Sequence, residues 1–133
     1  MRMRKQYSFW PGERGHDAWD VDRLVELTRD FPVIDVDIAA IADVDTDYWF
    51  RYGPVVPTVR TIVEHLRLIE EVDVSHPIIL GADGRVMDGM HRVAKALLDG
   101  ESTIRAVRFE VDPEPDYRDC RPEDLPYPDD DGN

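Results

Sequence analysis

Residues 76–98 read HPIILGADGRVMDGMHRVAKALL, and this stretch decides the predicted fold. The apolar run after His76 predicts a strand, and Asp83-Gly84 is typical of a tight hairpin turn. The next apolar residues return as the second arm of the hairpin. A helix is then expected from Gly89 to about Leu98, because an Asp-Gly pair follows it and favours a helix stop.

The remaining patterns predict elements on both sides of this hairpin. We expect a helix over 20–29, a strand over 33–38, an amphipathic helix over 58–71 and a final strand over 103–111. Thr58 is a good N-cap for the second of these helices. This order predicts a compact single domain of the α+β (mixed α/β) class.

The two ends of the chain differ in composition from its middle. Residues 1–17 are rich in glycine and charge and are expected to form an irregular arm, so the domain is assigned to 18–111. Residues 112–133 are predicted to be an acidic, proline-rich tail that is extended or disordered. From Val111 onward there are nine acidic and two basic residues, which is −7 of the net charge of −13.

Charge and cysteine content exclude several classes of function. A strongly acidic surface repels the phosphate backbone of nucleic acids, so nucleic-acid binding is disfavoured. The single cysteine, Cys120, allows neither an internal disulfide nor a multi-thiolate zinc site. We see no signal peptide and no membrane span, and we expect a cytoplasmic protein.

The main candidate site is Asp88-Gly89-Met90-His91-Arg92, where the predicted helix begins. The first turn of a helix has unpaired backbone N–H groups and the positive end of the helix dipole. The side chains of His91, Arg92 and Lys95 are expected to neighbour one another there. Cations at this end are locally unfavourable unless an anion binds between them and the helix, so the pattern predicts an anion site.

A purely structural interpretation of the same residues stays open. Asp88 would then be a plain N-cap, Arg92 would pair with a nearby acid, and His91 would be a surface or core residue.

The motif also resembles a known family. The Asp88-Gly-Met-His-Arg92 run, after a hairpin that opens with His76-Pro-Ile-Ile-Leu and before an Ala-rich helix, is similar to the DGxHR signature of the ParB/sulfiredoxin-like superfamily. The likeness covers roughly 33–111. It implies the ParB/sulfiredoxin-like fold, with a small mixed sheet and flanking helices, and it implies nucleotide use.

The resemblance also implies roles for single residues. Gly89, Met90 and His91 would offer backbone N–H groups to nucleotide phosphates, and the side chains of His91 and Arg92 would contact the β or γ phosphate. Asp88 would orient the turn or help to hold Mg²⁺.

Departures from the family narrow the choice of function. Met90 stands where sulfiredoxins place a catalytic cysteine, so sulfinic-acid repair is not expected. Partition proteins continue into a helix-turn-helix domain, whereas an acidic tail is predicted after this motif, so DNA partition is not expected. The free serine kinases fit the motif better, although their catalytic glutamate has no evident counterpart here.

Other residues offer further roles. Thr58 and Arg60 could add phosphate contacts, and Glu64 could act as a general base, or Arg60 and Glu64 could simply pair on a solvated helix face. Asp35 and Asp37 share one strand face, which is the wet side of a sheet or a metal site. An aromatic cluster could stack on a base, cover the cleft, plug the core or form a dimer contact; its members are Tyr48, Trp49, Phe50 and Tyr52.

Three functions follow from these observations. The first is a nucleotide-dependent phosphotransferase or nucleotide hydrolase that uses Mg²⁺ with ATP, ADP or CTP, with Asp88, His91 and Glu64 as candidate catalytic residues. The second is a non-catalytic module that changes its interactions on binding nucleotide. The third is a ParB-like nuclease, which the acidic charge disfavours. The expected partners are a nucleotide, an unidentified small molecule or protein, and a second copy in a homodimer.

Overall fold

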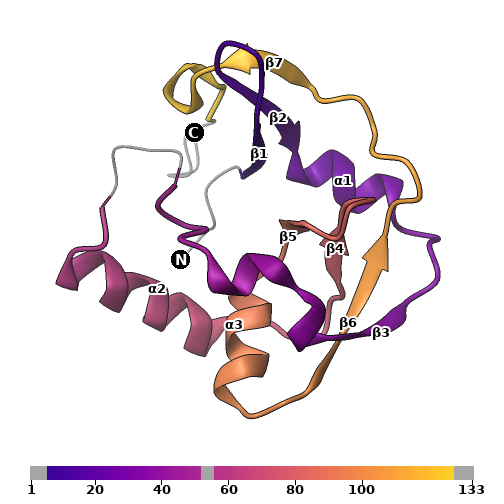
Figure 1. Cartoon of the computed structure of the whole chain (residues 1–133), viewed down its shortest axis with the longest axis vertical. Helices are drawn as coiled ribbons and strands as arrows, with labels where there is room; N and C mark the ends of the chain where they lie inside the picture. Colours follow the sequence, from indigo (N-terminus) through magenta and orange to yellow (C-terminus); the bar gives the residue numbers. More distant parts are fainter. Residues whose placement is uncertain (1–5, 52–55, 128–133) are drawn as a thin grey trace. The chain divides into compact units, whose positions relative to one another are not determined.

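The computed structural model describes residues 6–51 and 56–127, and it confirms the α+β class (Figure 1). The helices are α1 (Val21–Leu27), α2 (Val59–Glu71) and α3 (Met90–Leu98), with 3₁₀ turns η1 (Ile38–Ala40), η2 (Ala42–Asp45) and η3 (Pro122–Asp124). The strands are β1 (Tyr7–Pro11), β2 (His16–Asp20), β3 (Ile34–Asp37), β4 (Ile78–Leu80), β5 (Val86–Asp88), β6 (Thr103–Arg108) and β7 (Tyr117–Cys120). Within these ranges no helix is long and apolar enough to cross a membrane.

The chain divides into two compact units. The larger unit is Asp30–Asp112, and the smaller combines the described residues up to Arg29 with those from Pro113 onward.

The larger unit contains a four-stranded mixed sheet in the order β3-β6-β4-β5. Strand β6 pairs antiparallel with β3 and parallel with β4, while β4 and β5 form the predicted antiparallel hairpin. A parallel neighbour requires a long crossover, and β5 followed by α3 supplies it between β4 and β6. The predicted strands over 33–38 and 103–111 are confirmed as β3 and β6, although β6 ends at Arg108.

The core of this unit lies where α3 covers the sheet. All three residues of β4 are buried, which explains its continuous Ile-Ile-Leu run. The buried cluster consists of Ile41, Ile78, Leu80, Val86, Met90, Val93 and Ala106.

Helix α2 begins with the predicted N-cap, but most of its apolar side chains are exposed. The Thr58 hydroxyl accepts a hydrogen bond from the Thr61 backbone N–H at 3.2 Å, so the predicted N-cap is confirmed. None of the residues of α2 is buried, and its apolar side chains Val59, Ile62, Val63 and Leu66 are all exposed.

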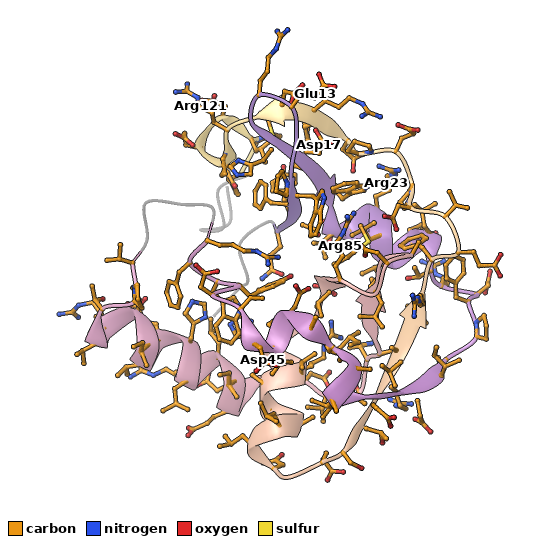
Figure 2. All side chains as sticks on the ribbon, viewed as in Figure 1. Glu13, Asp17, Arg23, Asp45, Arg85 and Arg121 are labelled. Carbon is orange, nitrogen blue, oxygen red and sulfur yellow. The ribbon has the colours of Figure 1, made fainter. Side chains whose placement is uncertain are left out.

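The smaller unit is built on an antiparallel sheet in the order β1-β2-β7. Helix α1 follows β2 directly, with Asp20 as its N-cap. Arg23 of α1, labelled in Figure 2, pairs with Asp116 at 2.6 Å and donates to the carbonyl of Glu114. These contacts tie α1 to the segment that precedes β7.

This sheet corrects two predictions. The described part of the predicted arm, residues 6–17, is not irregular, and the described part of the predicted tail, residues 112–127, is not unstructured, because β1, β2 and β7 pair with one another. His16 and Cys120 lie opposite each other in the pairing of β2 with β7. Pairing over such a separation leaves no local period in the sequence, and Pro113 and Pro115 precede the strand rather than interrupt it.

Candidate functional site

Gly89 joins β5 to α3 in a left-handed conformation, with φ of 105°. A Cβ added at this position would lie 2.7 Å from Cγ2 of Ile78 and 2.9 Å from Nη2 of Arg92. The glycine is therefore required by the turn and by its packing. The space that a side chain would occupy is filled by protein atoms, not kept open for a ligand.

The first turn of α3 has no side-chain cap. The backbone N–H groups of Arg92 and Val93 both donate to the carbonyl of Gly89, at 2.9 and 3.0 Å. Those of Met90 and His91 come too early in the helix to have an intrahelical acceptor. The backbone N–H groups at this end of the helix can therefore donate hydrogen bonds to the oxygen atoms of an anion, and the helix dipole favours negative charge there.

The cation of the motif is already paired. Arg92 Nη2 lies 2.8 Å from Oδ2 of Asp88, and the two side chains are only 12% and 17% exposed. Arg92 Nη1 also donates to the carbonyl of His76 at 3.1 Å. The geometry is that of the structural interpretation, in which Arg92 pairs with a nearby acid.

Arg92 and Lys95 share a groove that does not include His91. The two side chains line a pocket of about 230 Å³ together with His76, Arg105 and Asp99. Lys95 Nζ lies 3.7 Å from the Asp99 carboxylate. The residues that the sequence places side by side therefore separate onto different faces of α3.

His91 instead meets His65 of α2. Nδ1 of His65 and Nε2 of His91 lie 2.9 Å apart and share one hydrogen bond. One of these nitrogens must carry a proton and the other must not, so at least one of the two rings is neutral in this arrangement. We call this arrangement the histidine pair.

The Trp49 indole covers the histidine pair. Its ring centroid is 4.4 Å from that of His65 and 4.7 Å from that of His91, and both imidazoles are nearly parallel to it. Because the two imidazole centroids are only 5.1 Å apart, both rings lie against the same face of the indole. Phe50 packs edge-on against His65 at 5.5 Å. The pair is thus held in place by aromatic contacts as well as by its hydrogen bond.

Burial keeps the histidine pair neutral. Loss of hydration and, as the smaller cause, the neighbouring His65 together lower the pKa of His91 to about 4. Burial also lowers the pKa of His65, against the opposing effect of Glu64. At neutral pH, His91 is therefore a hydrogen-bonding group and a proton acceptor, not a cation.

The other predicted site residues lie apart from the histidine pair. Met90 is part of the core, at 7% exposure. Thr58, Arg60 and Glu64 are exposed on or beside α2, and no ion pair between Arg60 and Glu64 is present in the described ranges. Only His91 of the predicted side chains takes part in the arrangement with His65 and Trp49.

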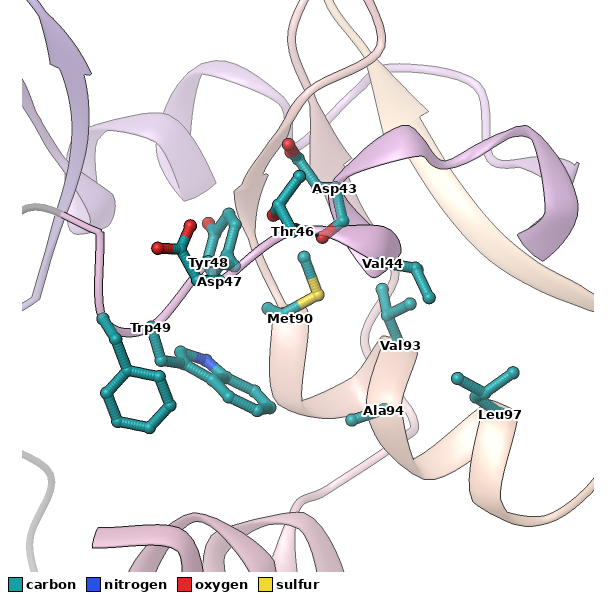
Figure 3. A pocket seen from close by; sticks show the side chains of 11 residues that line it. Asp43, Val44, Thr46, Asp47, Tyr48, Trp49, Met90, Val93, Ala94 and Leu97 are labelled. Carbon is teal, nitrogen blue, oxygen red and sulfur yellow. Dashed lines mark hydrogen bonds between the residues drawn. The ribbon is translucent and has the colours of Figure 1, made fainter. Parts of the chain in front are cut away.

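A second, larger pocket lies along α3. Its volume is about 340 Å³, and it is bounded by side chains of the segment 43–50 and by Met90, Val93, Ala94 and Leu97 (Figure 3). Trp49 lines it as well.

The aromatic segment beside this pocket is anchored to β5. The Tyr48 hydroxyl donates to the carbonyl of Val86 at 2.7 Å, and the Asp43 carboxylate accepts from the Val86 backbone N–H at 2.8 Å. Burial raises the pKa of the Tyr48 hydroxyl. Tyr48 and Trp49 pack against the core, while Tyr52 lies outside the described residues.

No group of three or more His, Cys, Asp or Glu side chains in the described ranges could hold a metal ion. Comparison of the chain with protein-family models, curated proteins and solved structures gave no significant match.

Sequence reasoning did not find the histidine pair. His65 lies on the side of α2 that packs against α3, with the half-buried residues Thr61, Leu68 and Ile69, whereas the apolar pattern emphasises the opposite, exposed residues. Thr61, His65 and Leu68 follow helical spacing in the sequence, but only Leu68 is apolar, so no apolar pattern marks this side of α2.

Proposed function

We propose that the start of α3 binds the phosphate groups of a nucleotide in a ParB/sulfiredoxin-like protein, and that the protein is a phosphotransferase or nucleotide hydrolase. The uncapped first turn of α3, with the neutral His91 in that turn, supports this proposal best. The order of elements around Asp88-Gly-Met-His-Arg92 is the one that the resemblance implies, with a hairpin before the motif and a helix after it.

The position of the shared proton in the histidine pair decides whether Nδ1 of His91 is a hydrogen-bond donor or a proton acceptor. If Nδ1–H of His65 donates to Nε2 of His91, then Nδ1 of His91 carries a proton and can donate to a phosphate oxygen. If Nε2–H of His91 donates instead, Nδ1 of His91 is a proton acceptor and can serve as a general base. The first tautomer suits binding, and the second suits catalysis.

Across residues 6–51 and 56–127, the side chains do not form a protein-held Mg²⁺ site. Asp88 is the carboxylate of the motif, and it is paired with Arg92. Mg²⁺ that enters with a nucleotide would be held mainly by its phosphates and by water.

Thermal shift tests the phosphate site. The full chain is heated with ATP, ADP, CTP, GTP or inorganic phosphate, each with and without Mg²⁺, and His91→Gln is compared with His76→Gln. A nucleotide at about a hundred times its dissociation constant should stabilise the fold by roughly 2.7 kcal/mol. We expect one nucleotide to stabilise the wild type and the His76 variant, and to stabilise the His91 variant less. An absence of any shift with all five ligands would refute the proposal.

A non-catalytic, nucleotide-responsive module is the second candidate. The stacked Trp49 covers one face of both imidazoles and so restricts access to them, which favours binding over turnover. Release of inorganic phosphate with the nucleotide that stabilises the chain separates the two: an enzyme releases it in many turnovers per chain, whereas a module does not.

A further inference from the structure

We propose that the 340 Å³ pocket along α3 binds a small molecule with a planar aromatic ring and an amino group. The amino group is neutral or positively charged. This ligand differs from the phosphate of the proposed function in charge and in the side of α3 that it contacts. The pocket belongs entirely to the larger unit and falls within the usual size range of small-molecule sites.

The floor of the pocket is apolar because of the side chains on one face of α3. Met90, Val93, Ala94 and Leu97 follow helical spacing from the first turn to the last. Figure 3 shows these four side chains along α3, and Ala94 is the smallest of them. Leu97 remains 52% exposed. Apolar surface left in contact with water favours a ligand that covers it.

Trp49 supplies a flat wall. One face of its indole is covered by the histidine pair, so neither imidazole covers the opposite face. The same contacts hold the indole in a fixed orientation, which reduces the entropy that a stacking ligand would otherwise lose on binding. A planar ring is the chemical group that matches such a wall.

The charged residues of the pocket are acidic. Asp43 is already engaged, because it accepts from the Val86 backbone N–H and lies 3.6 Å from Arg51. Asp47 also lines the pocket, is exposed, and has no ion pair within the described ranges. An amino or ammonium group on the ring would find a carboxylate there, whereas an anionic ring would be repelled.

Three probes with the same ring and different charges test the proposal. Tryptamine, tryptophol and indole-3-acetate carry positive, no and negative charge at neutral pH. Binding to the full chain is followed by methyl chemical shifts in NMR titrations. We expect shifts at Val93, Ala94 and Leu97, and tryptamine should bind about two- to fivefold more tightly than tryptophol. Indole-3-acetate should bind most weakly.

Two helix variants provide a matched comparison. Ala94→Leu fills the pocket and should weaken all three probes by about tenfold or more, because the ring loses its space. Ala96→Leu adds the same side chain to the same helix, on the side that lines the smaller groove, and should leave binding unchanged. Asp47→Asn should abolish the preference for tryptamine while tryptophol still binds.

Several outcomes would overturn the proposal. These are shifts confined to residues outside the pocket, no binding of any probe, tightest binding of the anionic probe, or equal binding by Ala94→Leu and wild type. If Ala94→Leu fails to fold, the wild-type shift map and the Asp47→Asn comparison decide the question. The phosphate panel is independent of these titrations, so failure here leaves the proposed function standing, and the reverse also holds.

Discussion

Helices α2 and α3 have similar apolar periodicity but different surroundings. Both are amphipathic, and they pack against each other (Figure 1). Helix α3 buries Met90 and Val93 in the core, whereas the apolar side chains of α2 remain in contact with solvent. Helix α2 begins at a side-chain cap, and α3 begins at a glycine without one. Apolar periodicity therefore identifies a helix and its apolar side, but it does not identify what covers that side.

The largest difference in stability between matched variants of α3 and α2 is expected when the substitution buries a charge. Val93→Asp places a carboxylate at a position with no exposure, so we expect a loss of about 3 kcal/mol or more of unfolding free energy, enough to unfold a marginal domain. Val63→Asp makes the same change in α2 at a side chain that is 46% exposed, and it should alter stability by no more than about 0.5 kcal/mol. Chemical denaturation of both variants measures the difference. Equal losses of stability would show that the exposed apolar side chains of α2 are covered in solution.

A smaller difference in stability is expected between glycine variants at the two ends of α3. Gly89→Ala forces a side chain into the left-handed region and against Ile78, so we expect a loss of about 1–3 kcal/mol. Gly100 also has positive φ, but a Cβ there would meet nothing within 4 Å, so Gly100→Ala should cost only about 1 kcal/mol. Denaturant midpoints of the two variants test this order. A smaller loss at Gly89 would mean that the turn into α3 relaxes easily.

Features that depend on neighbouring residues could be predicted from the sequence. Thr58 as a cap, the hairpin at Asp83-Gly84 and the start of α3 near Gly89 all follow from local backbone chemistry. The α+β class followed from the order of these elements.

Features that depend on distant contacts could not be predicted. The sheet of β1, β2 and β7 joins the two ends of the chain, and its strands carry no alternating apolar pattern that marks them. The observed candidate site differs from the predicted one for the same reason, because its contacts come from distant parts of the sequence. The motif places His91 and Arg92 side by side in sequence, but His91 turns to α2 while Arg92 is held by Asp88.

The histidine pair joins α2 to α3 and makes the stability of the chain depend on pH. The pKa of His91 is about 4 in the folded chain, below the ordinary value of 6.5, so the unfolded chain takes up a proton first as the pH falls. The contribution of His91 to stability is therefore constant above pH 6.5, decreases between 6.5 and about 4, and is fully lost below about 4. The lowered pKa of His65 acts in the same direction. Two protonated rings would both be donors and would repel each other across the 2.9 Å contact.

The measurement is the pH dependence of unfolding together with amide hydrogen exchange. In the wild type, α2 should lose protection in this pH range before the strands of the four-stranded sheet do, because the histidine pair connects α2 to α3. His91→Gln should reduce the slope of stability with pH between 6.5 and 4, while His76→Gln, which replaces an exposed histidine outside the pair, should retain it. Equal slopes in the two variants would show that the imidazoles are hydrated in solution. In that case α2 is held by its half-buried apolar residues alone, and the contrast with α3 is one of packing rather than of charge.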